Sequence, residues 1–266
     1  MTDDSGPATI PQDAHKRIAQ SKQGLFTSDL SVSEFALVRD AGFDPVGLVL
    51  GCSIYHLGFQ PPRTGNAEMT TLSQAMYDAR ELAMTRMREE ADGLGADGII
   101  GVRLEVGRHD WGSNMAEFMA VGTAIKHREG QLHRAPDGRP FTSDLSGQDF
   151  WTLLHTGHRP VGMVMGSCVY HVGHRGLVAA ATQLKQNVEM TNFTQALYDA
   201  RELAMARMQD EAERCQAKGI VGVQIQENHG QFDEHTVEFF AIGTAVIPTD
   251  GAAALGALTP VVSLDS

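Results

Sequence analysis

Gln-Ala-Met-Tyr-Asp-Ala-Arg-Glu-Leu-Ala-Met, residues 74–84, recurs at residues 195–205 as Gln-Ala-Leu-Tyr-Asp-Ala-Arg-Glu-Leu-Ala-Met. The two stretches lie 121 residues apart and differ only where Met76 corresponds to Leu197. Apolar residues recur along the first stretch at three- and four-residue spacing, which is typical of an amphipathic helix. A match of this length within one chain predicts that the helix, and the domain around it, is present twice.

A second sequence confirms that the repetition extends beyond one helix. Phe-Thr-Ser-Asp-Leu-Ser occupies residues 26–31 and again residues 141–146, which lie 115 residues apart. The spacing between the copies then increases to 121, which places an insertion within residues 173–188 of the second copy. The chain is therefore predicted to contain two copies of one domain.

The boundaries of the two domains follow from composition. Both ends of the chain lack periodicity and are predicted to be flexible tails. The stretch between the copies is polar and contains glycine and proline, which predicts a linker. The predicted units are a tail over 1–24, repeat 1 over 25–127, a linker over 128–139, repeat 2 over 140–247 and a tail over 248–266.

Each repeat is predicted to have the element order α-β-α-β-β. Ser31 and Glu34 have the spacing of a capping box, which starts a helix, and Gly42 suits the end of that helix. The expected fold is α+β, with a three-stranded antiparallel sheet packed by one long helix. The predicted elements of repeat 1 are a helix over 31–42, a strand over 45–57, a helix over 70–94, and strands over 98–106 and 116–126.

Composition excludes several classes of protein. The chain has 266 residues, of which 42% are hydrophobic, and 21 basic against 33 acidic residues give a net charge of −12. This charge argues against binding to nucleic acid, which depends on neutralising phosphates with Lys and Arg, and against binding to an anionic membrane surface. No apolar run reaches the roughly 20 residues that a membrane span needs. Three cysteines do not make a disulfide framework, so a cytoplasmic location is expected.

A sheet of three strands leaves edges that invite pairing with another chain. The glycine pairs Gly47/Gly51 and Gly162/Gly166 each lie on one face of a predicted strand, where another backbone could approach closely. These features predict a homo-oligomer.

The glycine-marked strands give the chain a family resemblance. Together with the long helix they resemble the YbjQ family, which is also named the putative heavy-metal-binding domain. The resemblance covers residues 45–126 and 160–247, and it implies α+β domains that assemble as pentameric rings. Five chains would supply ten domains, most simply as two stacked five-membered rings. The stretches that carry the resemblance are 98–102, 118–125, 219–223 and 239–246.

The family name raises the question of a metal site, for which zinc or copper would be the ions. Tyr55-His56 and Tyr170-His171 end corresponding strands just before a glycine, and histidine is a common metal ligand. A ring would bring several copies of these histidines together at subunit interfaces. The alternative is that they are structural residues at the end of a strand.

Carboxylates and thiols give further metal-ligand candidates. Glu117 and Glu238 occupy equivalent places in the last strand of each repeat, where each could bind a metal or pair with an arginine of the long helix, Arg80 or Arg86. Cys52 and Cys168 are weaker candidates. Residues four apart on a strand are separated by about 13 Å, which keeps Cys52 from sharing an ion with His56. These cysteines are expected to be buried and inert.

No catalytic motif is present in the sequence: it has no Walker-type phosphate loop, no Gly-x-Ser-x-Gly turn and no His-Glu-x-x-His. The expected function is a non-enzymatic, ring-forming homo-oligomer that binds a heavy metal or a small ligand between subunits. The alternatives are a purely structural scaffold, and an enzyme with active sites at subunit interfaces.

Overall fold

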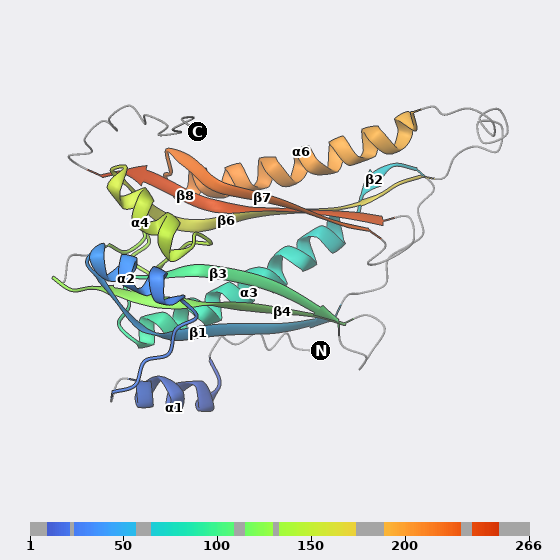
Figure 1. Cartoon of the computed structure of the whole chain (residues 1–266). Helices are drawn as coiled ribbons and strands as arrows, with labels where there is room; N and C mark the ends of the chain where they lie inside the picture. Colours follow the sequence, from blue (N-terminus) through green and yellow to red (C-terminus); the bar gives the residue numbers. More distant parts are fainter. Residues whose placement is uncertain are drawn as a thin grey trace, which may run out of the picture.

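The computed structural model describes residues 10–21, 24–56, 65–108, 115–129, 133–173, 189–229 and 236–249 (Figure 1). Helix α1 (Gln12–Ser21) precedes the two repeats. Repeat 1 contains α2 (Val32–Asp40), β1 (Phe43–His56), β2 (Ala67–Glu68), α3 (Thr70–Gly93), β3 (Gly98–Arg108) and β4 (Met115–His127). Repeat 2 contains β5 (Phe141–Thr142), α4 (Gly147–His155), β6 (His158–His171), α6 (Thr191–Arg214), β7 (Gly219–His229) and β8 (Thr236–Pro248).

Local sequence signals set the ends of the helices. The Ser31 side chain accepts a hydrogen bond from the Glu34 amide, and the Glu34 carboxylate accepts one from the Ser31 amide at 2.8 Å, which confirms the predicted capping box. Gly42 follows α2 with a φ of +91°, a conformation that favours glycine. At the start of α4 the Ser146 side chain accepts a hydrogen bond from the Asp149 amide.

The sheets differ from the prediction, because each has four strands rather than three. Their orders are β1-β4-β3-β5 and β2-β6-β8-β7. The fourth strand comes from the other repeat in both cases: β5 joins β3 in parallel, and β2 joins β6 in antiparallel orientation. The two repeats therefore exchange strands and are not structurally independent domains.

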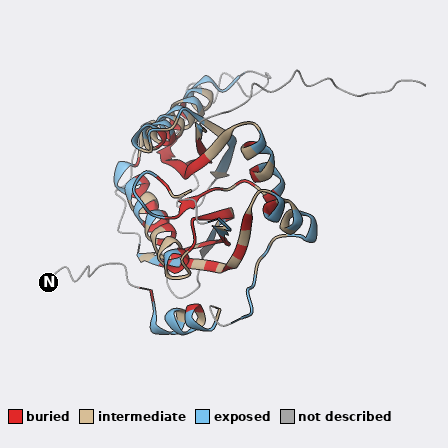
Figure 2. Ribbon diagram, turned by 90° about the vertical axis from the view of Figure 1, so that its left-hand side faces the viewer, coloured by how far each residue is buried: buried red, intermediate tan, exposed pale blue. Residues whose placement is uncertain are grey.

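The strand glycines serve packing within each repeat, which corrects the expectation that they present a bare face to another chain. A Cβ atom at Gly51 would lie 1.9 Å from the Ala83 carbonyl oxygen of α3, and one at Gly166 would lie 1.9 Å from the Ala204 carbonyl oxygen of α6. The approaching backbone is thus the repeat's own long helix. Figure 2 shows the buried residues gathered inside the molecule, between the sheets and the helices that pack on them.

Helix α1 lies within residues 1–24, so the prediction of a flexible tail there is wrong for this part of the chain. Ile18 is buried and would contact a Cβ at Gly93, at the end of α3. Arg17 pairs with the Glu90 carboxylate of α3 and donates a hydrogen bond to the Leu48 carbonyl at 2.8 Å. The helix was not anticipated because its docking depends on α3, far along the chain. Residues 250–266 of the second predicted tail lie outside the described residues.

Candidate functional site

The predicted metal ligands of the two repeats lie in different surroundings. Tyr55 and His56 end β1, and His56 is exposed. Tyr170 and His171 are buried at the end of β6, where β2 of repeat 1 pairs with them. The Nδ1 atom of His171 lies 3.1 Å from the carbonyl oxygen of Gly65, a hydrogen bond between the repeats.

The two candidate thiols do not form a common site either. Cys52 is exposed, so the prediction that it is buried is wrong. Cys168 is buried as predicted, and burial raises its pKa to about 12. A buried thiol with that pKa is protonated at neutral pH and therefore unreactive. Among the residues that the structure describes, no group of three or more His, Cys, Asp or Glu side chains could hold a metal ion. The described residues of one chain therefore do not build a zinc or copper centre on their own.

Glu238 forms a buried ion pair. Its Oε1 atom lies 2.5 Å from Nη2 of Arg80, and both side chains are only 1% exposed. The pair joins α3 of repeat 1 to β8 of repeat 2. Of the two arginines proposed from the sequence, Arg80 is the partner, and it comes from the helix of the other repeat.

Aromatic rings complete the surroundings of Arg80. Its guanidinium carbon lies 3.9 Å from the ring centroid of Phe240 and 5.3 Å from that of Phe118. The Nε and Nη1 atoms have no hydrogen-bond acceptor among the described residues. The guanidinium is therefore held by one carboxylate and by cation–π contacts with rings from both repeats.

Backbone and hydroxyl contacts extend this inter-repeat interface along α3. The Met69 amide donates to the Val169 carbonyl at 2.8 Å, and the Val169 amide donates to the Ser73 hydroxyl at 2.9 Å. Tyr77 donates to the Glu211 carboxylate of α6, and burial raises the pKa of Glu211. The first turns of α3 thus lie along the edge of β6.

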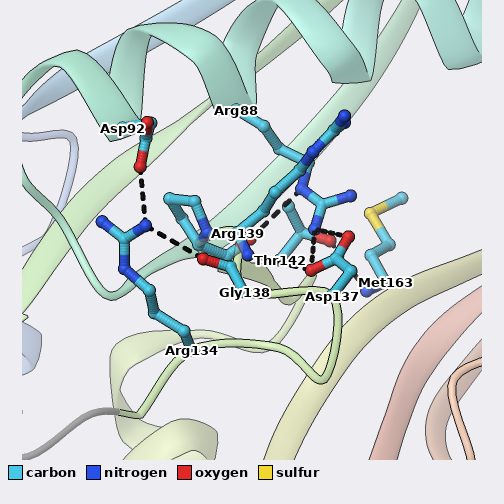
Figure 3. Close-up of polar contacts among 9 residues, drawn as sticks. Arg88, Asp92, Arg134, Asp137, Gly138, Arg139, Thr142 and Met163 are labelled. Atoms are coloured by element: carbon cyan, nitrogen blue, oxygen red, sulfur yellow. Dashed lines mark hydrogen bonds and ion pairs between the residues drawn. The ribbon is translucent and has the colours of Figure 1, made fainter.

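The linker reinforces the interface, as Figure 3 shows. The Arg88 guanidinium pairs with Asp137 at 3.0 Å and donates to the Pro140 carbonyl at 3.2 Å. Arg134 pairs with Asp92 at 2.7 Å. The linker is therefore fastened to α3, and it leads directly into β5.

The two sheets differ in how far their faces are buried, although their sequences match. Burial alternates along β1, with every second residue partly or fully exposed, whereas β6 is buried on both faces from Pro160 to its end. Ile54 is 51% exposed, but its counterpart Val169 is fully buried beside α3. In Figure 1, α6 lies on the side of the second sheet that faces away from the first.

The helix residues show the same inequality. Tyr77 is partly buried in the interface, while its counterpart Tyr198 is 53% exposed. Arg80 is buried, while Arg201 is exposed in part and pairs with its neighbour Glu202. Pairing of Glu238 with Arg80 was one of the two alternatives predicted from the sequence, but Tyr77 was not predicted as an interface residue. Both residues are repeated as Tyr198 and Arg201, and the repetition does not tell which copy is covered.

Comparison with known proteins places both repeats in one family. The family model described as "Putative heavy-metal-binding" (YbjQ) matches residues 64–128 and 155–249. The chain is 49% identical over 236 residues to the encapsulin nanocompartment protein Rv1762c of Mycobacterium tuberculosis, covering 88% of this chain and 89% of that protein.

Shorter relatives match parts of the chain. A UPF0145 protein of Pseudothermotoga lettingae is 33% identical over 89 residues, which is 31% of this chain and 82% of that protein. A UPF0145 protein of Halorubrum lacusprofundi is 43% identical over 61 residues, which is 23% of this chain and 57% of that protein. Within the described residues, no helix is both long and apolar enough to cross a membrane.

Proposed function

The chain belongs to the "Putative heavy-metal-binding" family, and on that premise we propose that it is a self-assembling structural component of an encapsulin nanocompartment. Copies of the chain join head to tail through a second version of the interface between the repeats. The link to a nanocompartment is inferred from the M. tuberculosis relative, which aligns along most of both chains. The proposal of an assembly rests on one observation. Strand β6 is buried on both of its faces, whereas the matching strand β1 is buried on one face only.

The surface of repeat 1 that would receive a second copy is apolar. The residues of repeat 2 that pack against α3 within the chain include Met163, Met165, Val169, Phe240 and Ile242. Their counterparts on the outer face of the first sheet are Leu48, Leu50, Ile54, Met119 and Val121. Matching apolar side chains at matching positions support α6 of another copy as the element that covers them, because burial of apolar surface drives association.

Charge supports the same alignment. The counterparts of Arg80 and Glu238 are Arg201 on α6 and Glu117 on β4. In the proposed joint, Arg201 of one chain meets Glu117 of the next. Arg201 already lies over the Tyr198 ring, 4.4 Å from its centroid, so its guanidinium is near the helix face that would be covered.

This joint is heterologous, because the surface that one copy offers differs from the surface that the next copy receives. Contacts of this kind produce a closed ring or an open filament. The pentameric stoichiometry predicted from the family resemblance remains a prediction. The metal sites predicted at Tyr55-His56 and Tyr170-His171 are not part of this proposal, since His171 is already used as an inter-repeat contact.

The mass of the protein in solution tests the joint. We expect wild-type protein to form assemblies well above the 28.7 kDa of one chain, measured by light scattering after size exclusion. Ile54→Asp places a charge in the apolar joint and is expected to yield monomers. Val106→Asp is the matched control, because Val106 is also an exposed strand residue but pairs with Phe118, on the face that carries α3. A wild-type monomer at micromolar concentration would defeat the proposal.

The nanocompartment role needs a separate measurement. The chain is co-expressed with the encapsulin shell protein of its own source, and the shells are purified by sedimentation. We expect the chain to co-sediment with the shells and to remain with them in high salt. A chain that stays in the supernatant would remove the compartment role and leave the assembly proposal in place.

A further inference from the structure

The outer edge of β7 differs from the matching edge of β3. Strand β7 pairs with β8, and no other described residue pairs with it. Val223 and Ile225 of this strand are exposed. An open strand edge presents unpaired backbone donors and acceptors, which makes it a template for another strand.

The edge of β3 shows what such an edge receives. Residues 141–145 lie along it in parallel orientation. The Phe141 amide donates to the Asp97 carbonyl at 3.0 Å, and the Ser143 amide donates to the Ile99 carbonyl at 2.9 Å. The Val102 amide donates back to the Ser143 carbonyl at 2.9 Å. The repeat-2 copy of Phe-Thr-Ser-Asp-Leu is thus a strand added to the sheet of repeat 1.

A glycine makes room for the phenylalanine of this added strand. A Cβ at Gly98 would lie 2.1 Å from the Phe141 ring, so only glycine fits beneath it. Gly219 is the counterpart on β7, and a Cβ there would meet nothing nearer than a Val246 methyl at 3.7 Å. The second sheet therefore keeps the same slot and lacks the ring that fills it.

The repeat-1 copy of the segment is held in the conformation that would fill the slot. The Asp29 amide and carboxylate both contact Thr123, as those of Asp144 contact Thr244. Phe26 stacks on Phe35 with ring centroids 5.9 Å apart, and the corresponding rings Phe141 and Phe150 are 6.0 Å apart. Yet Phe26 is 45% exposed and Phe141 only 1%. Residues 26–30 thus have the conformation of an added strand, but no described strand of the same chain pairs with them.

We propose that residues 26–30 of one chain add to β7 of a second copy as a parallel strand, with the Phe26 ring seated over Gly219. By correspondence with the internal contact, the Ser28 amide donates to the Ile220 carbonyl, and the Val223 amide donates to the Ser28 carbonyl. This is strand addition, in which backbone bonds supply affinity and a side-chain pocket supplies specificity. The inference rests on the head-to-tail assembly proposed above and names a second element of its joint.

Disulfide trapping between two differently tagged chains tests the contact. Phe141 and Gly98 are directly paired Cα partners, a relationship that suits a disulfide. One chain carries Phe26→Cys and the other Gly219→Cys. We expect a covalent heterodimer on mixing and oxidation, and none when Gln226→Cys, farther along β7, replaces Gly219→Cys. A disulfide that forms within a single chain carrying both cysteines, with none between chains, would overturn the proposal.

A second pair separates this inference from the assembly itself. Met190→Cys and Ile54→Cys report the α6 joint, because their counterparts Met69 and Val169 share a backbone hydrogen bond. If this pair links between chains and the Phe26→Cys/Gly219→Cys pair does not, the strand addition is wrong and the assembly stands. If neither pair links and the protein is monomeric, both fail.

Filling the slot gives an independent measurement. Gly219→Leu adds a side chain where a Cβ would meet only the Val246 methyl, at 3.7 Å, so the unfolding transition of the isolated chain is expected to stay unchanged. Association, followed by sedimentation velocity, is expected to weaken at least tenfold. An unchanged dissociation constant for Gly219→Leu would contradict the seating of Phe26.

Discussion

Replacing Arg80 by methionine would measure how much the buried ion pair contributes to holding the repeats together. The Arg80 and Glu238 side chains are each 1% exposed, so removal of one partner leaves the other charge buried and uncompensated. Such changes cost about 3–5 kcal/mol. The counterpart substitution Arg201→Met breaks a pair with Glu202 whose side chains are 40% and 67% exposed. Exposed pairs contribute about 0–1 kcal/mol.

Urea denaturation followed by circular dichroism tests this difference. With a slope of about 3 kcal/mol per molar urea, Arg80→Met is expected to lower the midpoint by about 1–2 M, and Arg201→Met by a few tenths at most. Both variants are measured at a protein concentration low enough for the chain to be monomeric, so that the proposed contact of Arg201 with Glu117 of another copy does not enter the comparison. The double variant Arg80→Met/Glu238→Gln is expected to cost less than the sum of the single variants, because the uncompensated charge is gone. Equal costs for Arg80→Met and Arg201→Met would refute the reasoning.

Four further outcomes are expected. Burial raises the pKa of Glu211 above its usual 4.5. Between the unfolded and the folded pKa the folded state keeps a proton that the unfolded state has released, so the free energy of unfolding falls as pH rises through this range. Glu211→Gln should flatten this slope in urea titrations run upward from about pH 4. Glu90 is the counterpart of Glu211, which accepts a hydrogen bond from Tyr77, so in the proposed joint it would accept one from Tyr198 of another copy. Arg17→Ala removes the ion pair that occupies Glu90 and should strengthen association several-fold in sedimentation. Weaker association would contradict the proposed joint. Iodoacetamide should label Cys52 in the folded protein and leave Cys168 unlabelled by mass spectrometry. Treatment with EDTA should leave the mass of the assembly unchanged, and dissociation would revive the predicted metal sites.

Local chemistry made much of the fold predictable. The capping box at Ser31 and Glu34 formed as predicted, because both partners lie within one turn of helix. The long helix was expected over residues 70–94 and spans Thr70–Gly93. Apolar spacing and a following glycine are enough for such an element, since they depend on neighbours in sequence.

The contacts between repeats could not be predicted in the same way. Strand β5 has two residues, and its pairing depends on where the β3 edge lies in space. Arg80 and Arg201 have almost the same sequence neighbours, so no local pattern could tell that one is buried. Their difference arises from the position of the second sheet, which covers α3 and leaves α6 open.

The exchange of β2 and β5 between the two sheets has a consequence for counting. Because of this exchange, the two repeats of one chain are neighbours in a single head-to-tail series. If the series closes into a ring, both repeats of every chain lie in that ring. A closed circle built only from this joint must then contain an even number of domains. Two stacked circles of five domains would require the repeats of a chain to lie in different circles, which is a different topology. Five chains supply ten domains in either arrangement, so the two have the same mass. The number of domains around the ring, ten or five, counted in electron micrographs of an intact assembly, would distinguish a single circle from a stack.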